Sequence, residues 1–213
     1  MKTHLLPLLL ALAGIIDASG AANLVPNPDF SDPKDPMATW RTYFPWESEW
    51  YAVNGNYVKP ATMDGRTCAF LDFPPSVAAF QGGKIESAFF KIEPGAKYRA
   101  QVDLKILGGA VKIFTEAWTT DPDAGIQHDK WRVPAAADHP ALVTFYRAQF
   151  TDSRTPDPRG AGWCTASREF TVPKVAYVKG KQQVPEYMTF KVVVFGGGNS
   201  RVYVTNFRVT KIP

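Results

Sequence analysis

Residues 98–106 read Tyr98-Arg99-Ala100-Gln101-Val102-Asp103-Leu104-Lys105-Ile106. Apolar side chains occupy every second position, and a period of two residues directs them all to one face of a β-strand. The turn signal 93–96 (Glu-Pro-Gly-Ala) precedes this run, and Gly108-Gly109 separates it from a second strand-like run, 110–118. The pattern therefore predicts a β-hairpin over residues 98–118.

Further strand-like runs cover much of the chain, at residues 67–73, 84–92, 141–150, 163–172, 187–195 and 201–212. The glycine-rich segment 196–199 joins the last two runs and predicts a second hairpin. In the final run Val202 and Val204 are in phase with each other but out of phase with Phe207 and Val209. A β-bulge at Thr205 and Asn206 would direct all four side chains to one face.

The whole pattern predicts an all-β fold, an antiparallel two-sheet β-sandwich or jelly roll. The chain contains 18 Pro and 16 Gly, which favour turns over long helices, and 45% hydrophobic residues, enough for a sizeable core. Segments 119–140 and 151–162 are predicted loops. No linker separates two domains, so we expect one domain over residues 23–213.

The first 22 residues have the composition of a cleavable signal peptide. Lys2 and His4 precede an apolar run, 5–16, and the small residues Gly20 and Ala22 follow it. That run is shorter than the roughly 20 residues of a membrane-spanning helix. We therefore expect the protein to be secreted or periplasmic.

Four segments resemble the cellulose-binding-C-type carbohydrate-binding modules. They are Asn23 to Phe30 followed by Trp40, then 84–98 with its Pro-Gly turn, 167–173 (Ser-Arg-Glu-Phe-Thr-Val-Pro), and the ending 201–209. Together they span nearly the whole predicted mature chain. The resemblance implies a galactose-binding-like jelly roll with a sugar cleft on the concave face of one sheet.

The same resemblance implies a structural calcium near the joined termini in many members. Ser31 and Thr205 stand where the family has Glu and Asp, whereas Asp29 and Asp32 remain as oxygen donors. Two expected ligands are therefore missing, and we predict no cofactor while leaving a calcium site open.

Sugar binding needs flat apolar faces for the ring and planar polar groups for its hydroxyls. Trp118 is the preferred stacking platform because it ends the second strand of the predicted hairpin, and Trp50 is second. The full set of candidate ligand-binding residues is Trp46, Trp50, Tyr51, Arg99, Gln101, Asp103, Glu116, Trp118 and Trp131. In the competing interpretation the polar residues form a solvated face and the aromatic ones pack beneath loops.

The sequence therefore predicts a non-catalytic domain that binds a poly- or oligosaccharide. The alternative is a secreted structural or protein-interaction sandwich without a sugar site. A jelly-roll polysaccharide lyase is less favoured, because His128 lies in a predicted loop and the other lyase motifs are missing. The net charge is +4 without a basic stripe, which argues against nucleic acid as a partner.

Cys68 and Cys164 are the two cysteines of the chain. In an oxidising compartment they would either form a disulfide bridge or remain as two buried thiols. Their separation in the sequence does not distinguish these alternatives.

Processing gives the first test. When the full chain is expressed with its leader, the exported protein should begin at or near Asn23. Intact-mass measurement on the exported fraction checks this, and an exported protein that retains Met1 would contradict it.

Overall fold

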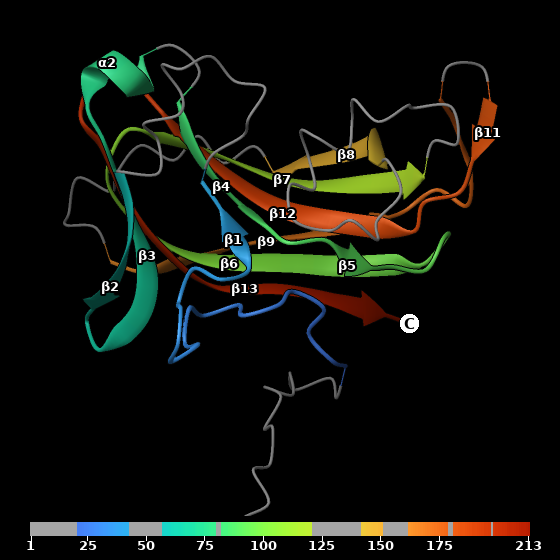
Figure 1. Ribbon diagram of the computed structural model, residues 1–213, viewed down its shortest axis with the longest axis horizontal. Coiled ribbons are helices and arrows are strands. Elements are labelled where there is room, and N and C mark those ends of the chain that lie inside the picture. The colour runs from blue at the N-terminus through green and yellow to red at the C-terminus, as the bar shows by residue number, and fades with distance from the viewer. Residues whose placement is uncertain are drawn as a thin grey trace, which may run out of the picture.

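The computed structural model describes residues 21–42, 57–79, 82–120, 142–150, 162–178, 181–196 and 198–213. In this part of the chain two antiparallel sheets lie one above the other (Figure 1). Buried side chains from both sheets form a hydrophobic cluster between them. The fold is an all-β, two-sheet sandwich of the jelly-roll type, which confirms the predicted class.

One sheet has six strands in the order β1-β4-β12-β7-β8, and β5 also pairs with β12. The strands are β1 (Trp40–Arg41), β4 (Gly83–Ser87), β5 (Phe90–Lys91), β7 (Ala110–Thr120), β8 (Leu142–Phe150) and β12 (Tyr187–Phe195). The run predicted as one strand, 84–92, is thus divided into two short strands that pair with the same neighbour.

The other sheet has five strands in the order β2-β3-β13-β6-β9. They are β2 (Val58–Met63), β3 (Arg66–Phe73), β6 (Lys97–Gly108), β9 (Cys164–Thr171) and β13 (Ser200–Ile212). β2, which contains Pro60, was not among the predicted strands. A proline is tolerated there because β2 lies at the edge of the sheet.

Three small elements complete the described chain. β10 (Ala176–Val178) pairs with β11 (Lys181–Gln183), and α2 (Pro75–Ala78) is a single helical turn. Within the described ranges, no helix has the length and apolar character needed to cross a membrane.

The alternation of apolar residues over 98–106 contributes one side of the core. Tyr98, Ala100, Val102, Leu104 and Ile106 of β6 are all at most 4% exposed. The residues between them are only partly buried or exposed and lie on the opposite face of the strand.

Both predicted hairpins are wrong. β6 pairs with β13 and β9, whereas β7 pairs with β12 and β8, so the connection between β6 and β7 passes from one sheet to the other. The connection from β12 to β13 makes the same crossing. Apolar and polar residues alternate in the same way in two strands that face each other across a core and in two strands that pair side by side. The alternation therefore does not distinguish a hairpin from a crossing between sheets.

Glycines allow these two crossings to meet. Gly109 has φ = 82°, and a Cβ there would clash with Ser200 Oγ and lie 3.0 Å from the carbonyl oxygen of Phe195. A Cβ on Gly196 would lie 3.2 Å from the Cα of Gly109. The two connections therefore pack backbone against backbone, in space that a side chain would fill.

The predicted bulge in the last strand is confirmed. The register of β13 against β6 shifts between Thr205 and Arg208, and Asn206 adopts φ = 53°. This shift brings Val204 and Phe207 to the same side of the sheet, and both are fully buried.

Cys68 and Cys164 are both free in the structure, which contradicts the disulfide alternative. Cys68 lies on β3 and Cys164 on β9, with β13 and β6 between these strands. Three strand spacings separate the two Cα atoms by about 14 Å, about twice the limit of roughly 7 Å for a bridge. Burial raises the pKa of the Cys68 thiol.

Substitution at the crossing should be costly. Gly109→Ala should lower the free energy of unfolding by about 2–4 kcal/mol, because it combines a left-handed backbone with a steric clash. Gly65→Ala is the control, since Gly65 has φ = 75° and nothing within 4 Å of its Cβ position. It should cost about 1 kcal/mol. Equal losses in urea denaturation would show that the close contact is unimportant.

Candidate functional site

The predicted site residues divide between the two sheets. Arg99, Gln101 and Asp103 alternate with the buried residues of β6, so they lie on the outer face of the five-stranded sheet. Glu116 and Trp118 alternate with the core residues of β7, on the outer face of the six-stranded sheet. Because the core lies between these faces, the prediction that all five residues line one cleft is wrong.

Four further candidates lie outside the described residues: Trp46, Trp50, Tyr51 and Trp131. His128 also lies outside them. Their proposed roles stay predictions.

Trp118 is not an exposed platform. Its side chain is 1% exposed, its indole N–H donates to Thr189 Oγ1 at 3.1 Å, and its ring contacts Phe89 edge-on with centroids 5.6 Å apart. Trp118 follows the outward phase of β7, but it is packed there between neighbours. The structure thus contradicts its placement on an open rim.

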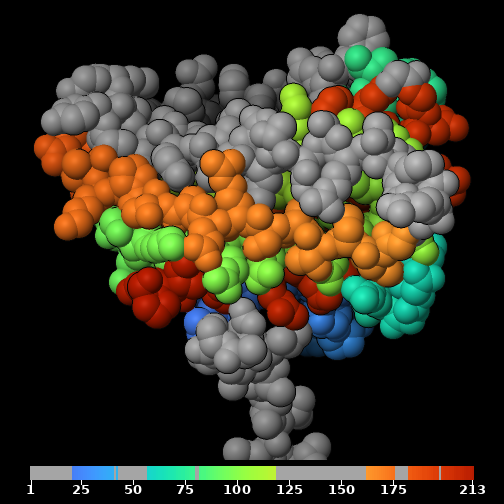
Figure 2. Space-filling model, turned by 180° about the vertical axis from the view of Figure 1, so that it is seen from behind, coloured from blue at the N-terminus to red at the C-terminus, as the bar shows by residue number. Residues whose placement is uncertain are grey.

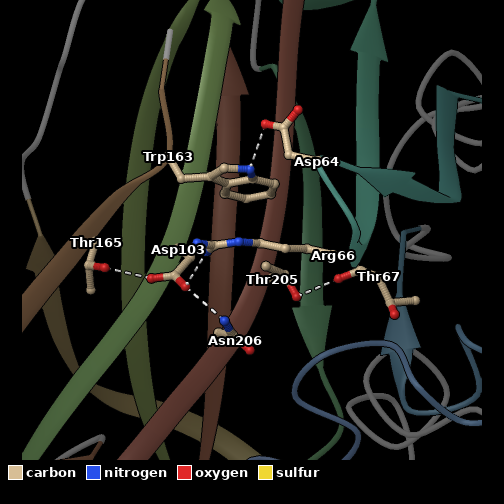
Figure 3. A network of polar contacts seen from close by, with 8 residues as sticks. All are labelled: Asp64, Arg66, Thr67, Asp103, Trp163, Thr165, Thr205 and Asn206. Atoms are coloured by element: carbon tan, nitrogen blue, oxygen red, sulfur yellow. Dashed lines mark hydrogen bonds and ion pairs between the residues drawn. The ribbon is translucent and has the colours of Figure 1, made fainter.

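Asp103 is the centre of a polar network on the outer face of the five-stranded sheet (Figure 3). Its carboxylate accepts hydrogen bonds from Thr165 Oγ1 at 2.6 Å and Asn206 Nδ2 at 2.8 Å, and it forms an ion pair with Arg66 at 3.2 Å. The partners come from β3, β9 and β13. Asp103 therefore ties neighbouring strands together, and each of its two carboxylate oxygens already accepts a hydrogen bond.

Asp64 and Trp163 extend this network. Asp64 accepts hydrogen bonds from Lys105 Nζ at 2.7 Å and from the indole N–H of Trp163 at 3.1 Å. The guanidinium of Arg66 lies 5.0 Å from the centroid of the Trp163 ring. The hydrogen bond from Lys105 is the main cause that holds the pKa of Asp64 below its usual value.

Arg99 is also engaged within its own sheet. It forms a salt bridge of 2.7 Å with Glu169 of β9, which also pairs with Lys97 at 2.7 Å. Hydrogen bonds from these two cations lower the pKa of Glu169, and the bond from Lys97 is the larger cause. Seen from behind, β9 forms an orange band next to β6, in green (Figure 2). Gln101 faces Ser167 on one side and Arg208 on the other.

A different group of charges lies on the outer face of the six-stranded sheet. Lys191 of β12 lies between Glu116 of β7, at 2.9 Å, and Glu86 of β4, at 3.7 Å. The side chains of Glu116 and Glu86 are 0% and 3% exposed, and that of Lys191 is 11% exposed. We call these three residues the Lys191 cluster. It is a buried polar group on the sheet face that points away from the core.

The burial of the Lys191 cluster distinguishes this face from an ordinary solvated sheet surface. Removing charged groups from water costs several kcal/mol per ion, and ion pairs and hydrogen bonds must offset that cost. Two carboxylates supply acceptors and one ammonium supplies donors within a few ångströms of each other. Neither Glu86 nor Lys191 was among the predicted site residues. Lys191 stands as a charge between the apolar residues Phe190 and Val192, which was the available signal, whereas Glu86 lies between Ile85 and Ser87 and gave no such signal.

The residues near the expected calcium position have hydrogen-bond partners within the protein. Asp29 Oδ1 accepts a hydrogen bond from Ser31 Oγ at 2.6 Å, and Asp32 Oδ1 accepts one from the backbone N–H of Lys34 at 2.8 Å. The hydroxyl of Thr205 donates to the carbonyl oxygen of Thr67 at 2.7 Å (Figure 3). Over the described ranges, no three His, Cys, Asp or Glu side chains are close enough to share a metal ion.

A hollow of about 810 Å³ opens where the ends of the described chain meet, beside Leu24, Ile92 and Ile212. Ala21 and Ala22 form part of its wall, and both belong to the predicted leader. If the leader is removed, this hollow loses that wall. Its lining includes the ion pair of Lys211 with Glu93, whose side chains are 50% and 67% exposed, and no buried charges like those of the Lys191 cluster, so it is a weaker candidate.

No protein-family profile matches the sequence, and no curated protein matches it. Solved structures do. A Stig cyclase, Fisc from Fischerella sp. TAU, is 14% identical with a TM-score of 0.53 over 91% of this chain and 98% of the cyclase. A CBM4 protein is 12% identical with a TM-score of 0.45, covering 88% and 99% of the two chains. A CBM61 module in complex with β-1,4-galactotriose is 12% identical with a TM-score of 0.43, covering 90% and 100%. At such identities the likeness to the cyclase shows a common fold alone.

Because the Lys191 cluster is buried, breaking it should change the free energy of unfolding measurably. Lys191→Met should lower the free energy of unfolding by about 3–5 kcal/mol, because two buried carboxylates lose the ammonium between them. Lys97→Met is the matched control, since its salt bridge joins side chains that are 47% and 39% exposed. It should cost less than about 1 kcal/mol. Similar losses in both variants would show that the cluster is solvated.

Proposed function

We propose that the protein is an exported, non-catalytic carbohydrate-binding domain of the cellulose-binding-C type. The sugar site lies on the outer face of the six-stranded sheet, around the Lys191 cluster. The observation that carries the proposal is the burial of this cluster on a face that points away from the core. The sequence resemblance and the jelly-roll fold support the same function.

The chemistry of the face suits a sugar. Carboxylate oxygens accept hydrogen bonds from hydroxyl groups and an ammonium donates them, and Lys191, which is 11% exposed, is the member of the cluster that a sugar hydroxyl can reach most directly. Hydrogen bonds to charged groups are the stronger ones, which suits a ligand that is well hydrated in water. Tyr187 and Phe195 of β12 lie on the same face and are half-buried, so they offer apolar surface to a ring.

Export rests on the signal-peptide pattern of residues 1–22. The side chain of Asn23 accepts a hydrogen bond from the backbone N–H of Val209 at 3.0 Å and donates one to the carbonyl oxygen of Phe207 at 2.9 Å. The first residue of the proposed mature chain is thus held against β13, and cleavage before it would leave these bonds intact.

Glu86→Gln tests the sugar site. The amide keeps the shape of the carboxylate but removes one of the two charges that hold the ammonium of Lys191. Isothermal titration with cellohexaose, xylohexaose and hexagalacturonate should show binding to the wild type, weakened about tenfold in the variant. Glu169→Gln, on the five-stranded sheet, should bind as the wild type does.

The same titrations separate the alternatives. A wild type that binds no oligosaccharide would favour the structural or interaction domain. Chromatography of the recovered sugar should show it intact, and cleaved products would contradict a non-catalytic role. Melting temperatures of both variants show whether a loss of binding reflects a loss of fold.

A further inference from the structure

Two stacked aromatic rings lie on the outer face of the five-stranded sheet. Phe70 of β3 pairs with Tyr203 of β13 on one side and with Lys59 of β2 on the other. Phe70 alternates with the core residues Ala69 and Leu71, so it lies on the outer face. The centroids of the Phe70 and Tyr203 rings are 4.3 Å apart, and their planes differ by 16°. Tyr203 therefore covers one face of the Phe70 ring, and the other face is directed towards β2.

A hollow of about 110 Å³ opens beside the second face of this ring. Its lining consists of Tyr57, Lys59, Phe70 and Asp72. Phe70 is half-buried, whereas Lys59 and Asp72 are exposed, so a ligand can approach the ring from solvent. Sites that enclose a drug-sized molecule measure roughly 300–1,000 Å³. The hollow therefore suits a single small ring rather than a chain of several units.

The hollow has charges of both signs at its rim. Asp72 is 50% exposed, and its carboxylate lies 3.6 Å from Nε of Arg201. The guanidinium of Arg201 lies 5.7 Å from the centroid of the Phe70 ring. A cationic ligand would meet Lys59 and Arg201, and an anionic ligand would meet Asp72. A neutral ligand with hydroxyl groups suits both signs, because a hydroxyl donates to a carboxylate and accepts from an ammonium.

We infer that this hollow is a second binding site, which takes one neutral monosaccharide unit, such as the end or a single-unit branch of a polysaccharide. The C–H face of the sugar ring lies against Phe70, and its hydroxyl groups donate to Asp72 and accept from Lys59. The inference rests on the proposed function for the class of ligand alone, because this site and the Lys191 cluster lie on different sheets. One domain would then hold two saccharide chains, one on each face of the sandwich.

NMR titration of the ¹⁵N-labelled exported protein with cellohexaose tests the inference, because it follows each face separately. Amide signals around Phe70 should shift with a dissociation constant of their own, distinct from that of the signals around Lys191. Phe70→Leu stays apolar but lacks the flat ring, and it should weaken binding at this hollow about fivefold. Asp72→Asn should weaken it about threefold. Glu86→Gln, on the other face, should leave it unchanged, and Glu169→Gln, on the same sheet, should affect neither site.

The outcomes distinguish this inference from the proposed function. Shifts confined to the six-stranded sheet would overturn the second site and keep the first. Shifts around Phe70 alone would support the second site and overturn the placement of the first. Equal shifts around Phe70 with hexaproline would show affinity for any apolar ring and overturn the inference. If Phe70→Leu lowers the melting temperature, Asp72→Asn decides, because it alters an exposed group, and unchanged binding there would contradict the inference. Absence of shifts on both faces would overturn both proposals.

Discussion

A single left-handed residue in the closing strand, Asn206, connects the inside of this sandwich to its surface. The bulge at Asn206 restores the inward phase of β13 and directs Phe207 into the core, where its ring contacts Phe30, Trp40 and Phe190. The Asn206 side chain meanwhile donates to Asp103 on the outer face. The core packing and the surface network of the five-stranded sheet therefore depend on the same irregularity.

The sequence predicts which residues form strands better than it predicts their partners. Strict alternation identified β6, the strand-like run after Gly108 and Gly109 identified β7, and two apolar pairs out of phase located the bulge in β13. Alternation reports only that one face is buried, so it could not show that β6 and β7 lie in different sheets. β2 was not predicted because it contains Pro60, and proline argues against a strand. An edge strand such as β2 nevertheless tolerates proline, which is rare in central strands.

The candidate site was harder to predict for a related reason. Glu86, Glu116 and Lys191 lie on three strands that come together only when the sheet forms, so no local spacing reveals them. Trp118 shows a second limit of the sequence. Its position at the end of a strand does not indicate whether its ring is exposed or buried. A charge between apolar neighbours, as at Lys191, was the signal that pointed to the buried cluster.

The central position of the last strand also determines when the domain can fold. β13 pairs with both β3 and β6, and the backbone N–H of Leu24 donates to the carbonyl oxygen of Val209. During synthesis, the five-stranded sheet is split into separate pieces until Ser200–Ile212 has emerged from the ribosome. Pairings between residues so far apart in the sequence also form slowly, because the chain between them must first be brought together. The pairing of β2 and β3 with β6 and β9 into one sheet therefore waits for the synthesis of β13.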